Sequence, residues 1–301
     1  MKKVHNFSAG PSILPAEVIQ QTASAIQEFD GMGLSILEIS HRSKNFEKVV
    51  EEARQSVKEI LNLPDRFEVL FLQGGATLGF HMAAMNFMKE GGSAVYANTG
   101  VWASGAIKEA KLLGQVDVPF DSSGSNHNHI PEVAFKGNYD YAHYTSNNTI
   151  YGTQYHATPP SEVPLICDMS SDIFSRPVDA AAHALIYAGA QKNLGPAGAT
   201  LYIVDKEKLG QTGRKLPIYM DLKAHIEKDS MYNTPPVLSI YTCMLTLRWI
   251  KSMGGLVGME KRNNDKQTLF YNELDRNSLF HGHAVKEARS WMNPTFRLND
   301  D

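Results

Sequence analysis

The chain contains very little cysteine: Cys167 and Cys243 are its two cysteines, and neither belongs to a paired motif. This scarcity excludes a disulfide-stapled scaffold and a cysteine-based zinc site, and it favours a reducing, cytoplasmic location. No run of residues is long and apolar enough to span a bilayer, and the basic start of the chain is not followed by the apolar core of a signal peptide. We therefore expect a cytoplasmic protein without membrane association.

The chain also lacks an excess of charge of either sign. Its 29 basic and 32 acidic residues give a formal net charge of -3. Nothing in this balance recruits DNA, RNA or anionic membranes, so an anionic ligand has to be held by local groups. With 43% hydrophobic and 20% charged residues in 301, the composition is that of a globular protein with room for roughly two domains.

Helical and strand-like patterns alternate along the chain. Apolar residues recur at helical spacing over 45–61, and further helices are expected over 102–113, from Pro235-Pro236 to about 252, and from there to about 274. Short, almost continuously apolar runs are typical of strands buried on both faces of a parallel sheet. They cover 67–72, 93–97, 139–144, 165–167, 185–187 and 201–204, with a last candidate at 292–298 that has few partners left. The pattern predicts an α/β fold.

A glycine-rich turn, Gly74-Gly75-Ala76-Thr77, joins the first of these strands to a helix. Small residues let a ligand approach the backbone, and the free N–H groups and positive dipole end of a helix start favour phosphate. Many strand-to-helix turns are rich in glycine for steric reasons alone, so the turn by itself leaves both readings open.

The most informative pair is an aspartate and a lysine that follow two strands. Asp168 ends the strand-like run at 165–167, and Lys192 lies 24 positions later in the small-residue segment 188–198. Such a pair at the carboxyl edge of a sheet is what pyridoxal phosphate chemistry requires. The lysine amine forms an imine with the cofactor aldehyde and later moves a proton, while the carboxylate holds a proton on the ring nitrogen.

Two pairs of alternating histidines, His127 with His129 and His281 with His283, have no convergent cysteine or carboxylate partners in the sequence. We expect them to lie in solvated loops, and we expect no metal site. Neither a P-loop nor an HExxH motif is present.

Taken together, several segments resemble the phosphoserine aminotransferases, a family of class V, fold-type I pyridoxal-phosphate enzymes. The matching segments occur in the family's order and cover essentially the whole chain. They are Asn6-Phe7-Ser8-Ala9-Gly10-Pro11, Ile39-Ser40-His41-Arg42, Gly74-Gly75-Ala76-Thr77, the segment around Trp102, Asp168-Met169-Ser170-Ser171, Ser175-Arg176-Pro177-Val178-Asp179, Tyr187-Ala188-Gly189-Ala190-Gln191-Lys192-Asn193 and Asn233-Thr234-Pro235-Pro236.

The resemblance implies a role for each matching residue. Lys192 is the lysine that binds the cofactor, Asp168 is the partner of its ring nitrogen, and Trp102 stacks on the ring. Thr149 bonds the ring hydroxyl. The remaining roles are contacts to anions: Ala76, Thr77 and Gln191 hold the cofactor phosphate, Asn233 and Thr234 reach it across a homodimer interface, and His41 and Arg42 bind the substrate anion.

Two departures from the family pattern affect the substrate site. Many members have an arginine where this chain has Thr77. The family sequence also continues past the position of Asp301, and that continuation carries a His-Arg pair and an arginine for the substrate anions. We therefore expect an incomplete smaller lobe, formed by residues 1–15 and 256–301, beside a large domain over residues 16–255.

The implied reaction is transamination between L-glutamate and 3-phosphohydroxypyruvate, which yields 2-oxoglutarate and O-phospho-L-serine for serine biosynthesis. Two alternatives stay open from the sequence. One is a class V aminotransferase with a different acceptor, and the other is a cofactor-binding dimer with impaired catalysis.

Overall fold

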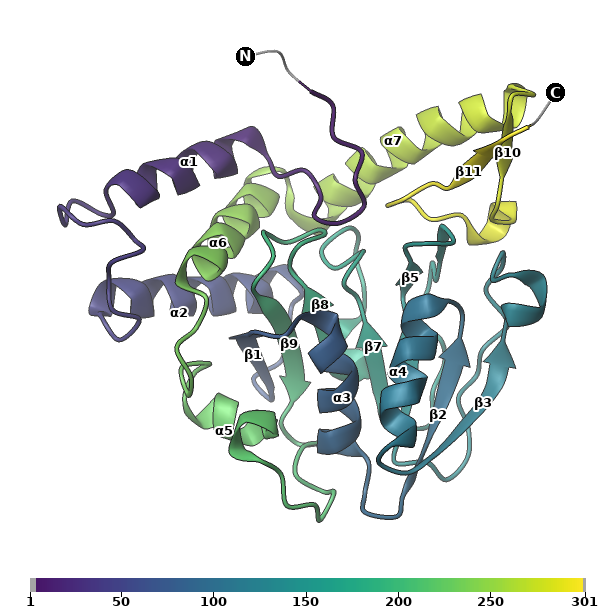
Figure 1. Cartoon of the computed structure of the whole chain (residues 1–301), viewed down its shortest axis with the longest axis horizontal. Coiled ribbons are helices and arrows are strands. Elements are labelled where there is room, and N and C mark those ends of the chain that lie inside the picture. Colours follow the sequence, from purple (N-terminus) through teal and green to yellow (C-terminus); the bar gives the residue numbers. More distant parts are fainter. Residues whose placement is uncertain (1–3, 300–301) are drawn as a thin grey trace.

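The computed structural model describes residues 4–299, and its centre is a seven-stranded sheet with helices on both faces (Figure 1). The strands are β1 (Phe67–Leu72), β2 (Ser93–Asn98), β3 (Gln115–Asp121), β4 (Tyr141–Thr145), β7 (Leu165–Asp168), β8 (His183–Gly189) and β9 (Thr200–Asp205). They are ordered β1-β9-β8-β7-β4-β2-β3, and β9 is antiparallel to both of its neighbours while the other pairs are parallel. The expected α/β fold with a mostly parallel sheet is confirmed.

Each face of the sheet has its own helices and its own core. The helices are α1 (Ala16–Gln27), α2 (Lys44–Ile60), α3 (Gly75–Phe87), α4 (Val101–Lys111), α5 (Leu222–Glu227), α6 (Val237–Ser252) and α7 (Gly255–Arg276). In β8, Ile186 packs into the core formed with α2 and α6, whereas Leu185 and Tyr187 pack into the core formed with α3 and α4. This alternation buries both faces, which explains why the central strands are apolar without interruption.

Most of the predicted elements are present, but helices α1 and α5 and several short strands were not predicted. The prediction missed β3, an edge strand whose apolar side chains alternate with polar ones and which contains Pro119. An edge strand tolerates proline because one row of its N–H groups needs no partner in the sheet. The predicted strand over 292–298 is shorter than expected: β11 (Phe296–Leu298) pairs only with β10 (Phe280–Gly282).

The β10–β11 ribbon lies apart from the main sheet and packs on the far end of α7 (Figure 1). Phe280 and Phe296 contact each other edge-on, with ring centroids 5.1 Å apart. The division into a large domain over 16–255 and a lobe formed by both terminal segments stays a proposal. Within residues 4–299, no helix combines the length and apolar character needed to cross a membrane.

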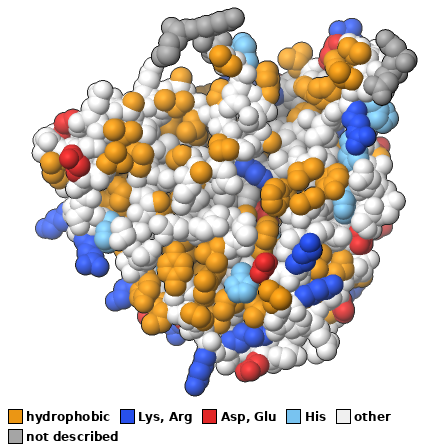
Figure 2. Space-filling model, viewed as in Figure 1, with side chains coloured by type: hydrophobic (Ala, Val, Ile, Leu, Met, Phe, Trp, Pro, Cys, Tyr) orange, Lys and Arg blue, Asp and Glu red, His pale blue; other side chains and the backbone are white. Residues whose placement is uncertain are grey.

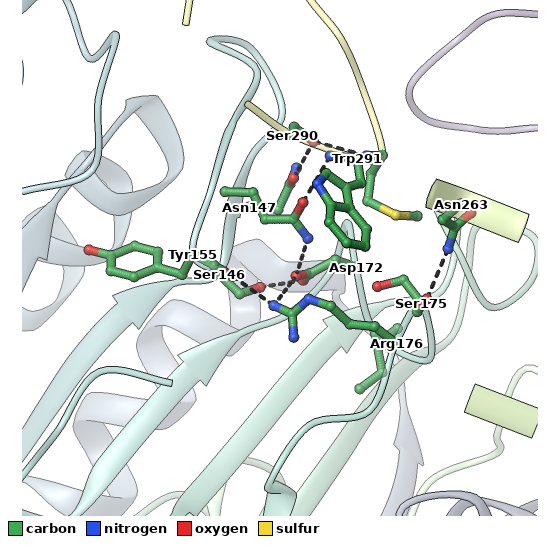
Figure 3. Close-up of polar contacts among 12 residues, drawn as sticks. Ser146, Asn147, Tyr155, Asp172, Ser175, Arg176, Asn263, Ser290 and Trp291 are labelled. Atoms are coloured by element: carbon green, nitrogen blue, oxygen red, sulfur yellow. Dashed lines mark hydrogen bonds and ion pairs between the residues drawn. The ribbon is translucent and has the colours of Figure 1, made fainter. Parts of the chain in front are cut away.

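A buried ion pair lies within the segment that follows β7. Asp172 is 6% exposed, and its carboxylate accepts hydrogen bonds from Ser146 and Gln154 and lies 3.5 Å from Arg176. Burial raises the pKa of Asp172, and the arginine opposes that shift. Arg176 also donates to the carbonyl of Tyr155 at 2.7 Å, so that it joins two segments (Figure 3).

Replacing Arg176 with methionine is expected to lower the free energy of unfolding by about 3–5 kcal/mol, because the buried Asp172 charge loses its counter-ion. Urea unfolding of the cofactor-free protein measures the loss. The double variant R176M/D172N removes the uncompensated charge and should recover a large part of the stability. A single variant within about 1 kcal/mol of the wild type would show that the pair contributes little.

Candidate active site

The predicted site residues gather at the carboxyl edge of the parallel strands. Asp168 is the last residue of β7, and its register partners are Thr145 at the end of β4 and Tyr187 near the end of β8. Lys192 follows β8 after a three-residue step. Because parallel strands end at one edge, residues far apart in the sequence meet there, as in other open α/β sheets.

The Lys192 amine is fixed by two hydroxyl groups. Its Nζ donates to Thr149 Oγ1 at 2.7 Å and to Ser171 Oγ at 3.1 Å, and these two oxygens lie 2.7 Å apart. Burial lowers the pKa of Lys192, although Asp168 and Asp172 act in the opposite direction. More of the amine is therefore neutral than in an exposed lysine, and the neutral form is the nucleophile.

Asp168 is a buried carboxylate with one oxygen engaged. Its Oδ1 accepts from the backbone N–H of Ser170 at 2.9 Å and from the Ser170 hydroxyl at 2.6 Å. Ser170 is held in turn by the N–H of Gly189, which donates to its hydroxyl at 3.0 Å. Within the described chain, Oδ2 has no hydrogen-bond donor. Burial raises the pKa of Asp168, so a positive partner for Oδ2 would be strongly favoured.

An aromatic ring lies next to the amine, and an open cleft lies beside that ring. Lys192 Nζ lies 5.6 Å from the centroid of the Trp102 ring. Trp102, which is 38% exposed, lines a cleft of about 450 Å³ together with Thr77, His127 and Tyr151. A partly exposed indole beside a lysine amine is unusual for a core tryptophan and suits the stacking of a flat ring.

The start of α3 faces the same region. Gly74 has φ +98°, and a Cβ there would lie 2.4 Å from Leu78, so only glycine fits this turn. The backbone N–H groups of Gly75, Ala76 and Thr77 belong to the first helical turn and have no acceptor in the described chain. They form the kind of cradle that binds a phosphate group.

The segment that precedes α1 contacts the turn that carries Lys192; in Figure 1 it is the dark purple loop beyond the upper ends of the central strands. The N–H of Ser12 donates to the carbonyl of Gln191 at 2.9 Å, and the Ser12 hydroxyl donates to the carbonyl of Lys192. A Cβ on Gly10 would lie 3.0 Å from Lys192 Cγ. The glycine of the Asn6–Pro11 segment thus leaves room for the lysine side chain. Gln191 lies half-buried in this contact, beside Gly189.

Four predicted residues lie outside the Lys192–Asp168 cluster. Asn233 and Thr234 are exposed and lie just before α6, where Asn233 Nδ2 donates to Gln73 Oε1 at 3.0 Å, next to the turn that starts α3. His41 and Arg42 lie in the turn before α2. Within the described chain, no hydrogen bond or ion pair joins either of them to Lys192 or Asp168.

The expectation that His127 lies in a solvated loop is wrong. Its side chain is 8% exposed, its Nδ1 lies 3.0 Å from the hydroxyl of Ser122, and its ring lies 4.8 Å from the ring of Tyr151. Burial lowers the pKa of His127, which favours the neutral ring. The backbone of the loop takes a left-handed conformation at Asn126 and His127, and this turns the histidine inward against the cleft.

Comparisons with known proteins agree with this geometry. The family model described as "Aminotransferase class-V" matches residues 4–299. The phosphoserine aminotransferase of Flavobacterium psychrophilum is 55% identical over 302 residues, which cover 100% of this chain and 85% of the relative. The phosphoserine aminotransferase of Parabacteroides distasonis is 52% identical, with 100% and 84% covered.

The chain belongs to the phosphoserine aminotransferases of class V.

Solved structures of the family superimpose closely on the chain. The phosphoserine aminotransferase from Bacillus circulans subsp. alkalophilus has a TM-score of 0.94 and 43% identity, covering 98% of this chain and 83% of its own. The PLP-bound phosphoserine aminotransferase from Trichomonas vaginalis has a TM-score of 0.93 and 32% identity, with 98% and 84% covered. These likenesses confirm the predicted fold-type I architecture and the class V family. The roles assigned to individual residues stay predictions.

Three residues next to the amine received no role from the sequence. Ser171 contacts Lys192, Ser170 holds Asp168, and Asp172 adds a second buried carboxylate. The only signal for the first two is that they lie two and three positions after Asp168, in the same matching segment. Nothing in the sequence marks Asp172 as buried, because two of its partners, Ser146 and Gln154, come from an earlier part of the chain.

Proposed function

We propose that this protein transfers the amino group of L-glutamate to 3-phosphohydroxypyruvate, giving 2-oxoglutarate and O-phospho-L-serine, with pyridoxal 5'-phosphate as the cofactor. One observation carries the proposal: the half-buried Lys192 amine lies beside the Trp102 ring and close enough to Asp168, a buried carboxylate with one oxygen free, for that charge to act on its pKa. The 55% identity to a relative named phosphoserine aminotransferase supports the choice of substrates.

The residues fit the cofactor at each of its polar groups. Lys192 offers the amine for the aldehyde, Asp168 Oδ2 is free for the ring nitrogen, and the N–H groups at the start of α3 are free to hold the phosphate. Thr149 would contact the ring hydroxyl and Gln191 the phosphate. When bound, pyridoxal phosphate supplies an aldehyde that condenses with amines and a ring that accepts electrons from the substrate Cα.

The side chains of this protein control where protons lie. Lys192 Nζ, with its lowered pKa, can act as a base toward the substrate Cα–H. It could then deliver this proton to the cofactor carbon that is joined to the substrate nitrogen. The hydroxyls of Thr149 and Ser171 hold Nζ in place between these events. With the cofactor bound, Asp168 would keep its negative charge, since a protonated ring nitrogen beside Oδ2 would offset the cost of burying that charge.

We further propose a cytoplasmic homodimer in which Asn233 and Thr234 of the partner subunit reach the cofactor phosphate and His41 and Arg42 bind the substrate anion. Both cysteines are free and buried, which suits a reducing compartment. Hydrophobic side chains gather on the surface of α1 and the segment before it (Figure 2), where Ile13, Ile19 and Ile26 are 67%, 52% and 39% exposed. A second copy would cover such a surface.

The test of function is a direct assay of products. The purified protein with pyridoxal phosphate, L-glutamate and 3-phosphohydroxypyruvate should give O-phospho-L-serine and 2-oxoglutarate in equal amounts, measured by mass spectrometry. Pyruvate and oxaloacetate serve as acceptors without phosphate. A higher kcat/KM with either of them would replace the proposed substrate. If none of the three acceptors is converted, the result supports the alternative of a cofactor-binding protein with impaired catalysis.

A further inference from the structure

The segment over residues 289–295, the last part of the connection from β10 to β11, lies along the loop over residues 147–154 (Figure 3). The N–H of Ser290 donates to the carbonyl of Gly152 at 2.8 Å, and the N–H of Trp291 donates to Gln154 Oε1 at 2.9 Å. Thr295 Oγ1 donates to the carbonyl of Tyr151 at 2.9 Å. Polar contacts therefore attach the two segments along their whole length.

Asn293 makes the contact that reaches furthest into the site. Its Nδ2 donates to the backbone carbonyl of Thr149 at 2.5 Å, and its Oδ1 accepts from Asn147 Nδ2 at 2.6 Å. The Ser290 hydroxyl donates to Asn147 Oδ1 at 2.5 Å, which closes the arrangement. The two ends of the turn at 147–149 are thus held by one side-chain amide.

Thr149 links this amide to the reactive amine. Its hydroxyl is the nearer of the two oxygens that accept from Lys192 Nζ, at 2.7 Å. Its carbonyl has Asn293 as its hydrogen-bond donor within the described chain. Without that donor, the half-buried carbonyl would turn toward water, and the rotation of the peptide would carry the hydroxyl away from Nζ.

We propose that Asn293 is a positioning residue, through which the 289–295 segment orients the Thr149 hydroxyl toward the Lys192 amine. The proposal rests on the proposed function of Lys192. It adds a residue that lies 101 positions after Lys192 in the sequence and outside the segments that resemble the family. It also gives the 289–295 segment a role in the chemistry of the site as well as in its packing.

The first measurement uses the cofactor-free protein, so that it does not depend on turnover. The rate at which an amine-reactive anhydride modifies Lys192 is measured against pH by peptide mass spectrometry, which gives the pKa of this amine. The variant Asn293→Ala should lower that pKa by about half a unit, because the ammonium form loses a hydrogen-bond acceptor while it stays buried. An unchanged pKa would overturn the proposal.

A double-variant cycle separates positioning from a general structural effect. If Asn293 acts through Thr149, then Asn293→Ala should shift the pKa in the wild-type background and have no further effect in Thr149→Ala. Additive shifts would overturn the proposal. Asn293→Leu, which has the same branched outline without the amide, replaces the alanine variant if that variant does not fold.

The matched control is Asn299→Ala. Asn299 also donates through its side-chain amide to a backbone carbonyl, that of Ser278 at 2.6 Å, but it does not contact the 147–154 loop. This variant should leave the Lys192 pKa unchanged.

In the cofactor-loaded protein, Asn293→Ala should lower kcat by about tenfold with little change in the KM for L-glutamate, whereas loss of a substrate contact would raise KM. If the loaded wild type is inactive but the pKa shift is present, the proposed function fails while the role of Asn293 stands.

Discussion

Replacing Lys192 with alanine is expected to lower kcat for transamination by about four orders of magnitude or more, which is the largest loss we expect from a single substitution. The side chain provides both the nucleophile that binds the cofactor and the base that moves the substrate proton, and a general base alone contributes about 10²–10⁴-fold. No other described lysine combines the contacts of Lys192 with Thr149, Ser171 and the Trp102 ring.

Two observations accompany this prediction. Borohydride reduction of the loaded wild type should attach the cofactor to the peptide that contains Lys192, and the label should be absent from Lys192→Ala. The matched control is Lys48→Ala, because Lys48 is an exposed lysine of α2. A label on any other lysine, or activity in the alanine variant within a hundredfold of the wild type, would contradict the assignment.

The parts of the site that could be predicted from the sequence are those that one segment carries alone. Asp168 and Lys192 follow buried strands, and once those strands are parallel their ends must meet at one edge. The glycine turn before α3 is likewise a local feature, because the φ of +98° at Gly74 permits only glycine without strain.

The parts that could not be predicted depend on contacts between distant segments. Asn293 looks like an ordinary loop asparagine until the fold places it beside Thr149, 144 positions earlier. The burial of Asp172 depends on Ser146, Gln154 and Arg176. Strand β3 alternates apolar and polar residues and contains a proline, unlike the continuously apolar central strands. Its position at the sheet edge is set by its pairing with β2 alone, a contact that the segment itself does not reveal.

Replacing Asp168 with asparagine is expected to lower kcat by about a hundredfold or more while the protein still binds the cofactor. The amide keeps the shape of the side chain and can still accept hydrogen bonds from Ser170. It carries no charge, however, that would hold a proton on the cofactor ring nitrogen. Absorbance titration with pyridoxal phosphate measures binding, and single-turnover kinetics with L-glutamate measure the loss. Full activity in this variant would show that Asp168 is not the ring partner.

The stability of the cofactor-free variant distinguishes this effect from misfolding. Burial raises the pKa of Asp168, so the folded state favours the protonated form, and the stability that this preference provides is present at low pH and lost as pH rises through the raised pKa. Asparagine does not ionise and shows no such loss. The variant should therefore gain stability relative to the wild type between about pH 4, the ordinary range of an aspartate pKa, and neutral pH. A variant that loses activity and also becomes less stable across this range would indicate a structural defect, whereas lost activity with this gain in stability shows a charge kept in the interior at a cost to the fold.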